Sequence, residues 1–310
     1  MKTKILKPFL FLAILVALMA ALGPVFRPKE AEELTQLKGL GEIDYLVVGD
    51  SEGWASFQPM EVWREDGFTG YNLSKPGQRL QDFYADLQTV LETQHPKVLL
   101  LETDILYKNL VSLTEFEGLL TSSLGELFPF IRYHEQWQKV LPDLSSSEKN
   151  EHTPDYARGA YINGTVMPYP DPDYYKAETD QVKKMPWLYR YFAEQIVSLC
   201  KENNIQLILY SSPSPKNWTY AIHNGLEAFA QEYDLEFIDF NLIQEEIGLD
   251  WSTDCLDDGD HINFAGSRKV TTYLSEYLAS HTRLTDHRGD PAFQIWDTDL
   301  RTYLTTTGQN

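Results

Sequence analysis

Cysteine and basic residues are both scarce in this chain. Only two cysteines, Cys200 and Cys255, occur among the 310 residues, so the disulfide framework of a small secreted domain is excluded. The two thiols are either free and buried or joined in one disulfide. Lysine and arginine number 26 against 46 acidic residues, which gives a net charge of −20. Because nucleic-acid binding needs clustered positive charge, this composition argues against a nucleic-acid partner.

Metal-binding sequence patterns are also missing. The chain has no HExxH pattern and no paired cysteines, so we predict neither a bound metal nor a cofactor. We find no internal repeat and no low-complexity tract. Apolar material is plentiful, with 43% hydrophobic and 13% aromatic residues. This is enough for a substantial core in one large or two small domains.

The first 27 residues have the pattern of a membrane anchor. Three lysines precede an uninterrupted apolar run over 8–26, and Arg27 follows it. At about 1.5 Å per residue, such a run can just cross a hydrocarbon core of roughly 30 Å. A cleaved signal peptide and a buried helix are the alternatives, although Pro24 directly after the small residues at 21–23 disfavours cleavage. The basic head predicts a single-pass membrane protein with its N-terminus inside and residues 28–310 outside the cytoplasm.

Short apolar runs alternate with amphipathic segments along the rest of the chain. Strands are predicted at 43–48, 70–73, 98–101, 205–210 and 235–239, and helices at 79–93, 187–203, 218–233 and 265–281. Near-continuous apolar strands require a sheet that is covered on both faces. The alternation therefore predicts an α/β fold, a three-layer α/β/α sandwich around a five-stranded parallel sheet.

One long interval does not follow this alternation. Residues 107–185 are rich in proline, tyrosine, serine and charge, and they contain no clear strand pattern. We interpret them as an insertion between strands three and four. It should lie over the carboxyl edge of the sheet, where open α/β sheets bind ligands.

A serine follows the first predicted strand, within the segment Gly49-Asp50-Ser51-Glu52-Gly53. At a strand-to-helix turn the Ser51 hydroxyl is exposed, and the helix N-terminus offers N–H groups to an oxyanion. Taken alone, the segment also fits the nucleophile elbow of an α/β-hydrolase or a helix whose N-cap is Ser51.

A histidine with nearby acids follows the last predicted strand. The segment Asp257-Asp258-Gly259-Asp260-His261 comes after the fifth strand and just before the last helix. In α/β-hydrolases the serine follows several strands, and the acid and base occupy separate loops. The chain order therefore disfavours a secreted lipase with that fold.

These segments resemble three sequence blocks of the SGNH (GDSL-like) hydrolases. Ser51 matches the GDS block, Gly77 within 71–78 matches the second block, and His261 within 260–263 matches the last. The resemblance covers about residues 41–281 except the insertion, and it implies a flavodoxin-like sheet. It also implies that Ser51 is the nucleophile, that His261 is its base, and that the backbone N–H groups of Ser51 and Gly77 form part of the oxyanion hole.

More narrowly, the chain is similar to exported, singly membrane-anchored SGNH-like proteins of Gram-positive bacteria. Such proteins often accompany membrane-bound O-acyltransferases that modify cell-surface polymers. The similarity implies a membrane-bound O-acyltransferase as partner and an acylated cell-surface polysaccharide as substrate.

The third SGNH block departs from the family pattern. It usually supplies an asparagine to the oxyanion hole, but this chain has Glu102-Thr103-Asp104 there. Thr103 is a weaker donor, and an ionised Glu102 or Asp104 would oppose the developing negative charge. Loss of one donor costs roughly 3–4 kcal/mol in well-studied hydrolases. The site is then slow, adapted to transfer, or completed by another asparagine. The asparagines considered are Asn72, Asn163 and Asn217.

Two aspartates compete for the role of supporting His261. The usual Asp-x-x-His spacing selects Asp258, and an acid four residues before the histidine selects Asp257. We favour Asp258, and we expect Asp260 to support the loop. The true partner has to lie within about 2.6–3.2 Å of the imidazole Nδ1.

The predicted substrate contacts are Asn72, Asn217 and Trp218. The segment 212–218 is otherwise a proline-fixed loop that leads into a helix capped by Asn217. The predicted function is a serine esterase or acyltransferase that acts on O-acetyl or short acyl esters of cell-envelope glycans. The alternative is a catalytically quiet SGNH-like scaffold that binds the polymer for a membrane-bound O-acyltransferase, and the missing asparagine keeps this alternative open.

Overall fold

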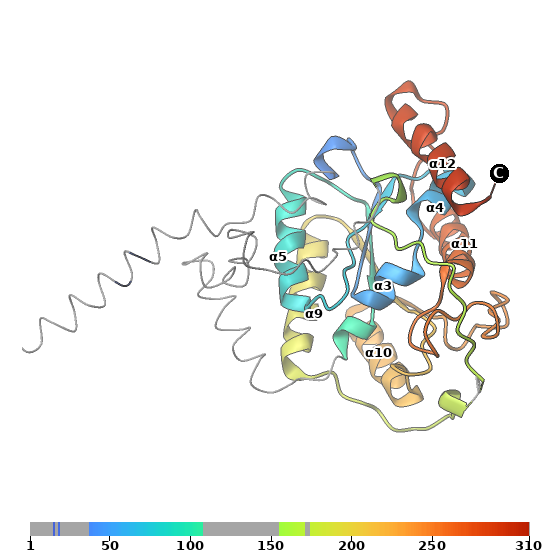
Figure 1. The fold of residues 1–310 in the computed structure, drawn as a ribbon. Coiled ribbons are helices and arrows are strands. Elements are labelled where there is room, and N and C mark those ends of the chain that lie inside the picture. Colours follow the sequence, from blue (N-terminus) through green and yellow to red (C-terminus); the bar gives the residue numbers. More distant parts are fainter. Residues whose placement is uncertain (1–14, 16–17, 19–36, 108–154, 171–173, 310) are drawn as a thin grey trace, which may run out of the picture. The chain divides into compact units, whose positions relative to one another are not determined.

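Five parallel strands form the central sheet of this computed structural model, in the spatial order β2-β1-β3-β4-β5 (Figure 1). The structure describes residues 15, 18, 37–107, 155–170 and 174–309. The strands are β1 (Tyr45–Val48), β2 (Gly70–Asn72), β3 (Val98–Glu102), β4 (Gln206–Ser211) and β5 (Glu236–Asp239). This order is that of the flavodoxin-like doubly wound folds, as the sequence predicts.

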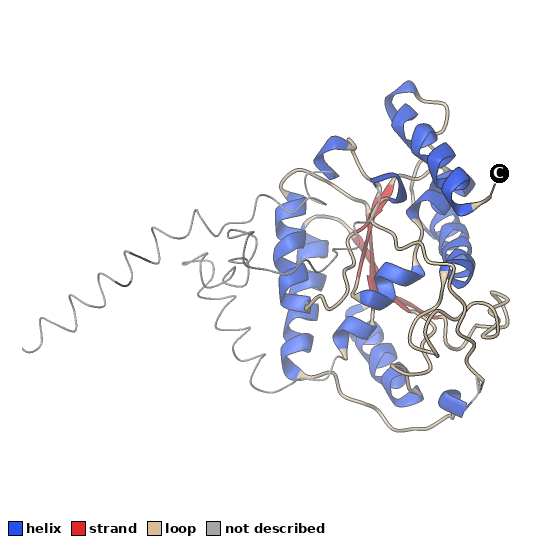
Figure 2. Cartoon of the chain, in the orientation of Figure 1, coloured by secondary structure: helices blue, strands red, loops and turns tan. Residues whose placement is uncertain are grey.

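Helices cover both faces of the sheet. The α-helices are α3 (Ser51–Ser56), α4 (Pro59–Asp66), α5 (Leu80–Leu91), α9 (Trp187–Glu202), α10 (Tyr220–Tyr233), α11 (Phe264–His281) and α12 (Gln294–Thr307). Short 3₁₀ turns are η1 (Asp104–Leu106), η4 (Asp155–Ala157), η5 (Tyr174–Lys176) and η6 (Pro291–Phe293). Figure 2 shows α5 and α9 on one side of the sheet, with α4 and α11 on the other. The three-layer α/β/α fold is thereby confirmed.

The strands are mostly apolar and largely buried because helices cover both faces of the sheet, and their exposed residues are Gln206 and Glu236, the first residues of β4 and β5. On one face Tyr45 and Val47 of β1 belong to a core cluster with Val270 and Leu274 of α11. Leu46, which points to the opposite face, is also fully buried. Alternation between polar and apolar residues would expose one face, so its absence is a direct consequence of the double cover.

The insertion between β3 and β4 is present, and its described part follows the carboxyl edge of the sheet. Tyr161 N donates to Trp54 O at 3.2 Å, and Met167 N donates to Cys255 O at 2.9 Å. The segment 155–170 thus contacts α3, which follows β1, and the loop that follows β5. The remainder of the predicted insertion, 108–154 and 171–173, lies outside the described residues.

A C-terminal helix, α12, has no counterpart among the helices predicted from the sequence. Its Trp296 and Tyr303 are fully buried. The ring of Trp296 lies 5.5 Å from that of Trp63 on α4, and the guanidinium carbon of Arg158 lies 4.5 Å from the Trp296 ring. The tail is therefore a packed part of the fold.

Most of the predicted membrane anchor falls outside the described residues. Only Leu15 and Leu18 of the run over 8–26 are described. Among the residues that the structure does describe, no helix is both long and apolar enough to cross a membrane. The anchor and its orientation stay predictions. Cys200 and Cys255 are both free and buried, so they form no disulfide in this structure.

Candidate active site

Ser51 is the first residue of α3, just beyond the carboxyl end of β1. The N-cap of this helix is Asp50, whose Oδ1 accepts a hydrogen bond from Glu52 N at 3.0 Å. The alternative that Ser51 caps the helix is therefore wrong, because Ser51 lies one residue inside it. Its side chain is partly exposed and makes no hydrogen bond to any described residue. The hydroxyl is thus left available for chemistry.

The glycines that flank Ser51 allow the end of β3 to approach the turn. A Cβ at Gly49 would lie 2.7 Å from Cβ of Glu102. A Cβ at Gly53 would lie 2.6 Å from Oγ of Ser74 and 3.1 Å from Cβ of Glu102. Larger residues would push α3 away from β3, so the Gly-x-Ser-x-Gly spacing here reflects close packing.

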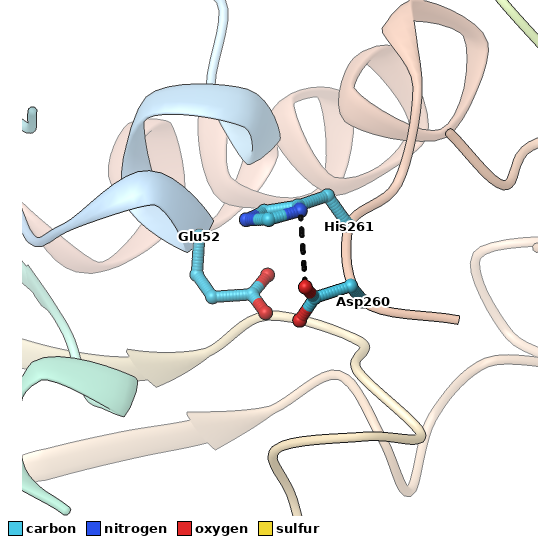
Figure 3. A group of neighbouring side chains, drawn as sticks. All are labelled: Glu52, Asp260 and His261. Atoms are coloured by element: carbon cyan, nitrogen blue, oxygen red, sulfur yellow. Dashed lines mark ion pairs between the residues drawn. The ribbon is translucent and has the colours of Figure 1, made fainter. Parts of the chain in front are cut away.

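His261 is held by Asp257. The imidazole Nδ1 lies 2.6 Å from Asp257 Oδ2, and the backbone N–H of His261 donates to Asp257 Oδ1, also at 2.6 Å. An antiparallel bridge between Cys255 and Ile262 closes the loop that carries this pair. The other ring nitrogen, Nε2, is buried and has no hydrogen-bond partner among the described residues. Figure 3 shows the ring between its own loop and the helix that carries Glu52.

The preference for Asp258 over Asp257 is corrected by this geometry. Asp258 and Gly259 both have left-handed backbone conformations, with φ of 60° and 88°. This turn directs the Asp258 carboxylate outward, where 63% of the side chain is exposed and Oδ2 lies 3.9 Å from Nζ of Lys216. A hydrogen bond from Gly259 N to Cys255 Sγ, 3.0 Å long, stabilises the turn. The number of residues between an aspartate and His261 does not reveal this backbone conformation.

Two further acids lie beside the histidine, and one of them was missed by the sequence analysis. Glu52, directly after the serine, is only 1% exposed, and its carboxyl lies close to Asp260 and His261 (Figure 3). One side-chain ligand atom of each of the three lies within 4.8 Å of the other two. Asn217 Nδ2 donates to Glu52 Oε1 at 2.8 Å and to Asp260 Oδ1 at 2.7 Å. The signal in the sequence was an acid placed in the first turn of the serine helix.

Asp260 has more than the loop-supporting role predicted for it. Its backbone oxygen accepts from Ser214 Oγ at 2.7 Å, which does anchor the loop. Its side-chain Oδ2 also lies 3.9 Å from Nδ1 of His261 (Figure 3). The carboxylate of Asp260 therefore contributes negative charge next to the imidazole.

Buried carboxyl groups dominate the electrostatics of the site. Burial raises the pKa of Glu52 well above its usual range, and the charges of Asp104, Glu102 and Asp50 raise it further. Burial, followed by the charges of Asp50 and Asp104, likewise raises the pKa of Glu102. The raised pKa of each group favours its neutral form. The opposition to an oxyanion expected from Glu102 is correspondingly reduced.

Glu102 is the last residue of β3 and is 1% exposed. Its Oε1 accepts from Ser212 N at 3.1 Å, and its Oε2 accepts from Asp104 N at 3.0 Å. The carboxyl group therefore ties the end of β3 to the end of β4. These two hydrogen bonds help to explain why a carboxyl group is tolerated at this buried position.

Asn72 does not contact the substrate site, contrary to the prediction. It is 1% exposed, and its amide Nδ2 donates to Gly53 O at 2.9 Å and Phe57 O at 3.2 Å. Its Oδ1 accepts from Ser74 N at 3.0 Å. Because its amide nitrogen and its amide oxygen are both hydrogen-bonded to backbone groups, Asn72 holds α3 in place.

The other residues that the sequence suggests as oxyanion donors are Thr103, Gly77 and Asn163, and each has its own surroundings. Thr103 is buried, and its Oγ1 lies 2.5 Å from Oγ of Ser211. Gly77 lies in an exposed turn with φ of 70°, and no hydrogen bond links it to Ser51 or His261 in the described part of the chain. Its participation in the oxyanion hole stays a prediction. Asn163 donates to Tyr161 Oη at 2.7 Å.

A pocket with an empty volume of about 280 Å³, part of it open solvent, adjoins this group of side chains. Its lining includes Glu52, Glu102, Thr103, Tyr107, Ser211, Ser212, Asn217 and Trp218. Trp218 is buried, with its Nε1 donating to Asp239 Oδ2 at 2.9 Å. The structure thus brings Asn217 and Trp218 to the pocket. The cap of α10 is Thr219, whose Oγ1 accepts from Ile222 N, so Asn217 is not the cap.

No protein-family model matches this sequence, and no curated protein matches it. Solved structures that are similar to this chain include the following three. A protein assigned as an acylhydrolase of Bacteroides fragilis has a TM-score of 0.43 and 13% identity, covering 82% of this chain and 98% of its own. The esterase EstA of a Pseudoalteromonas species has a TM-score of 0.39 and 12% identity, covering 76% and 97%. A gut microbial diltiazem-metabolizing enzyme has a TM-score of 0.28 and 16% identity, covering 77% and 47%. Similarity at this level does not define the family of the chain.

Proposed function

We propose that this chain is a serine esterase or acyltransferase that acts on O-acetyl or short acyl esters of cell-envelope glycans. The observation that carries the proposal is the Asp257–His261 pair, 2.6 Å apart, whose Nε2 is left without a partner beside the helix that Ser51 begins. An acid, a base in a fixed orientation and an uncommitted serine hydroxyl are the three parts of an activated nucleophile.

The reaction follows from the roles of these groups. Asp257 holds the proton on Nδ1, so Nε2 carries the lone pair that takes the Ser51 proton. Ser51 Oγ then bonds to the acyl carbon, and the carbonyl oxygen becomes an oxyanion near the N-terminus of α3. Collapse of this intermediate breaks the ester bond, and His261 returns the proton to the departing alcohol. Water hydrolyses the acyl-enzyme, or a sugar hydroxyl accepts the acyl group.

Ser51 and His261 are not hydrogen-bonded to each other in the structure, since neither Ser51 Oγ nor Nε2 has a partner among the described residues. Catalytic hydrogen bonds are often long in free enzymes and tighten when substrate binds. The oxyanion is assigned to the backbone N–H groups of Ser51 and Gly77.

The pocket supports a polar acyl acceptor or donor such as a glycan. Hydroxyl and amide groups of Thr103, Ser212 and Asn217 line it, and these groups can hydrogen-bond to sugar hydroxyls. The net charge of −20 disfavours polyanionic substrates. The apolar run over 8–26 would hold the domain at the cell envelope, with a membrane-bound O-acyltransferase as its partner.

The second function is a catalytically quiet scaffold. The observation that favours it is that Glu102 and Glu52, both 1% exposed, bring two carboxyl groups to the site, while the segment 101–104 lacks the asparagine of the third SGNH block. Such a site would bind the polymer without cleaving it, and Ser51 would then have no raised reactivity.

Labelling with a fluorophosphonate probe separates the two functions. We expect the full-length chain to be labelled and Ser51→Ala to be unlabelled. Ser56→Ala is the matched control, because Ser56 lies on the same helix with its hydroxyl bonded to that of Ser212 at 2.8 Å. Labelling of all three proteins would place the reactive serine elsewhere, and a folded wild-type chain without labelling would favour the scaffold.

A further inference from the structure

Two buried ligand atoms without partners point to a cation site at the centre of this region. Oε2 of Glu52 and Nε2 of His261 are both buried, and neither has a hydrogen-bond partner among the described residues. Buried polar atoms are nearly always paired, so two orphans in one cluster require an explanation such as a bound ion. Glu52 is only 1% exposed, which makes water a poor substitute partner.

The hydrogen bonds around the cluster leave one atom of each carboxylate uncommitted. The Asn217 amide donates to Oε1 of Glu52 and to Oδ1 of Asp260. Oε2 of Glu52 and Oδ2 of Asp260 therefore remain for a ligand, and Figure 3 shows the two carboxyl groups turned toward each other below the imidazole. Metal-binding carboxylates commonly have this arrangement, with one oxygen held by a neighbouring donor.

His261 likewise has one ring nitrogen held by a neighbour and the other left for a cation. Its Nδ1 is taken by Asp257 at 2.6 Å, which leaves Nε2 as the nitrogen that a cation would bind. A carboxylate on the second ring nitrogen is the usual support of a metal-bound histidine. Around tetrahedral zinc, nitrogen and oxygen ligands lie about 3.4 Å apart. One ligand atom of each of the three side chains lies within 4.8 Å of the other two, so these distances would have to shorten by up to about 1.4 Å.

We propose that Glu52, Asp260 and His261 bind a divalent cation of the zinc class, and that the bound cation blocks Ser51 by occupying Nε2 of His261. Imidazole nitrogen with two carboxylate oxygens is a donor set that zinc accepts and that calcium and magnesium, which prefer oxygen alone, bind less well. Because burial favours the neutral form of Glu52, the cation would have to displace the proton of this carboxyl group as it binds. The blocking effect rests on the function proposed above, whereas the binding itself does not. The usual zinc spacings are absent because the ligands come from two distant segments.

Calorimetric titration of the full-length chain with zinc chloride tests the binding. We expect one zinc ion per chain at this site, with Glu52→Gln and His261→Ala each weakening the affinity at least tenfold. Asp258→Asn is the matched control, because it removes an acid from the same loop outside the cluster, and its affinity should stay within twofold. Glu52→Gln keeps the oxygen that accepts from Asn217, and circular dichroism verifies that it folds.

The same titrations can also show that the proposed zinc site is wrong. Wild-type protein that binds no zinc, variants that bind it as tightly as wild type, or an equal loss in Asp258→Asn would each overturn the site. Equal loss in the control would assign the signal to the general acidity of the chain.

Competition with the fluorophosphonate probe tests the blocking. Zinc should slow the labelling of wild-type protein, a chelator should restore it, and the zinc concentration needed should rise at least tenfold in Glu52→Gln. Zinc that binds at the site without slowing the labelling overturns the blocking. A chain that never reacts with the probe removes the proposed function and the blocking with it, while the titrations still decide the metal site.

Discussion

At the scale of single residues, the support of His261 by Asp257 is the contact with the largest catalytic consequence. Asp257→Asn preserves the shape of the side chain but favours the wrong imidazole tautomer. We expect turnover of p-nitrophenyl acetate to fall by roughly ten-thousandfold, as it does in a well-studied triad. Steady-state kinetics of the full-length protein measure this loss.

Asp258→Asn provides the comparison for Asp257→Asn. The Asp258 side chain is 63% exposed and points toward Lys216, so its replacement should keep turnover within about tenfold. The reverse ranking of the two variants would return the supporting role to Asp258. Two mild effects would mean that His261 works without a fixed carboxylate.

The sequence indicated which segments form the site but not how their side chains divide the work. Ser51 and His261 were found because each follows a recognisable strand and lies in a short motif. The choice between Asp257 and Asp258 depends on two left-handed residues, 258 and 259, which no spacing rule reports. The position of Glu52 beside His261 depends on long-range packing and is likewise invisible in a local pattern.

At the scale of secondary-structure elements, α12 makes a prediction about stability. Trp296 is fully buried against Trp63 and the guanidinium of Arg158. Trp296→Ala should lower the free energy of unfolding by about 3–5 kcal/mol, because it leaves a large cavity. Chemical denaturation of the full-length chain measures the change.

The neighbouring residue of the same helix serves as the control for Trp296→Ala. Ile295 is 48% exposed, so Ile295→Ala should change the free energy of unfolding by no more than about 0.5 kcal/mol. Similar small effects of both variants would show that α12 contributes little to the fold.

The strands were predictable and α12 was not, for one physical reason. Most of the strands are short apolar runs that are buried on both faces, so their pattern is visible without knowledge of their neighbours. In α12 the buried surface consists mainly of Trp296 and Tyr303, and most of the remaining helix is exposed or partly exposed. A buried surface made of so few residues can be recognised only when the position of α4 is known. The ends of the predicted helices differ from the observed ones by no more than two residues, as the start of α10 at Tyr220 illustrates.

At the scale of the whole molecule, the apolar run over 8–26 predicts where the domain resides. Protease added to intact bacterial cells that express the full-length chain should digest the domain, because the basic head stays inside. Immunoblotting of the domain measures its loss, and a cytoplasmic marker protein that survives shows that the cells remained intact.

A charged variant tests whether the apolar run is responsible for this location. Leu15→Arg combined with Leu18→Arg adds roughly 2.5–3.5 kcal/mol per arginine to the cost of insertion, so the domain should become protected from the protease. A wild-type domain that is fully protected in intact cells would refute the predicted orientation. Release of the wild-type domain into the medium, with a new N-terminus, would instead identify a cleaved signal peptide.

The proposed nucleophile, Ser51, follows the first strand along the chain, whereas its proposed base, His261, follows the last. A ribosome adds about 5–20 residues per second, so the segment with Ser51 is made roughly 10–40 seconds before His261 exists. During that interval the growing chain holds a serine with no base to activate it. The proposed ester chemistry requires that α11 has been synthesised and has packed beside α3 and α4. The proposed enzyme is therefore inert throughout its own synthesis, and a chain that ends before residue 261 lacks the proposed base.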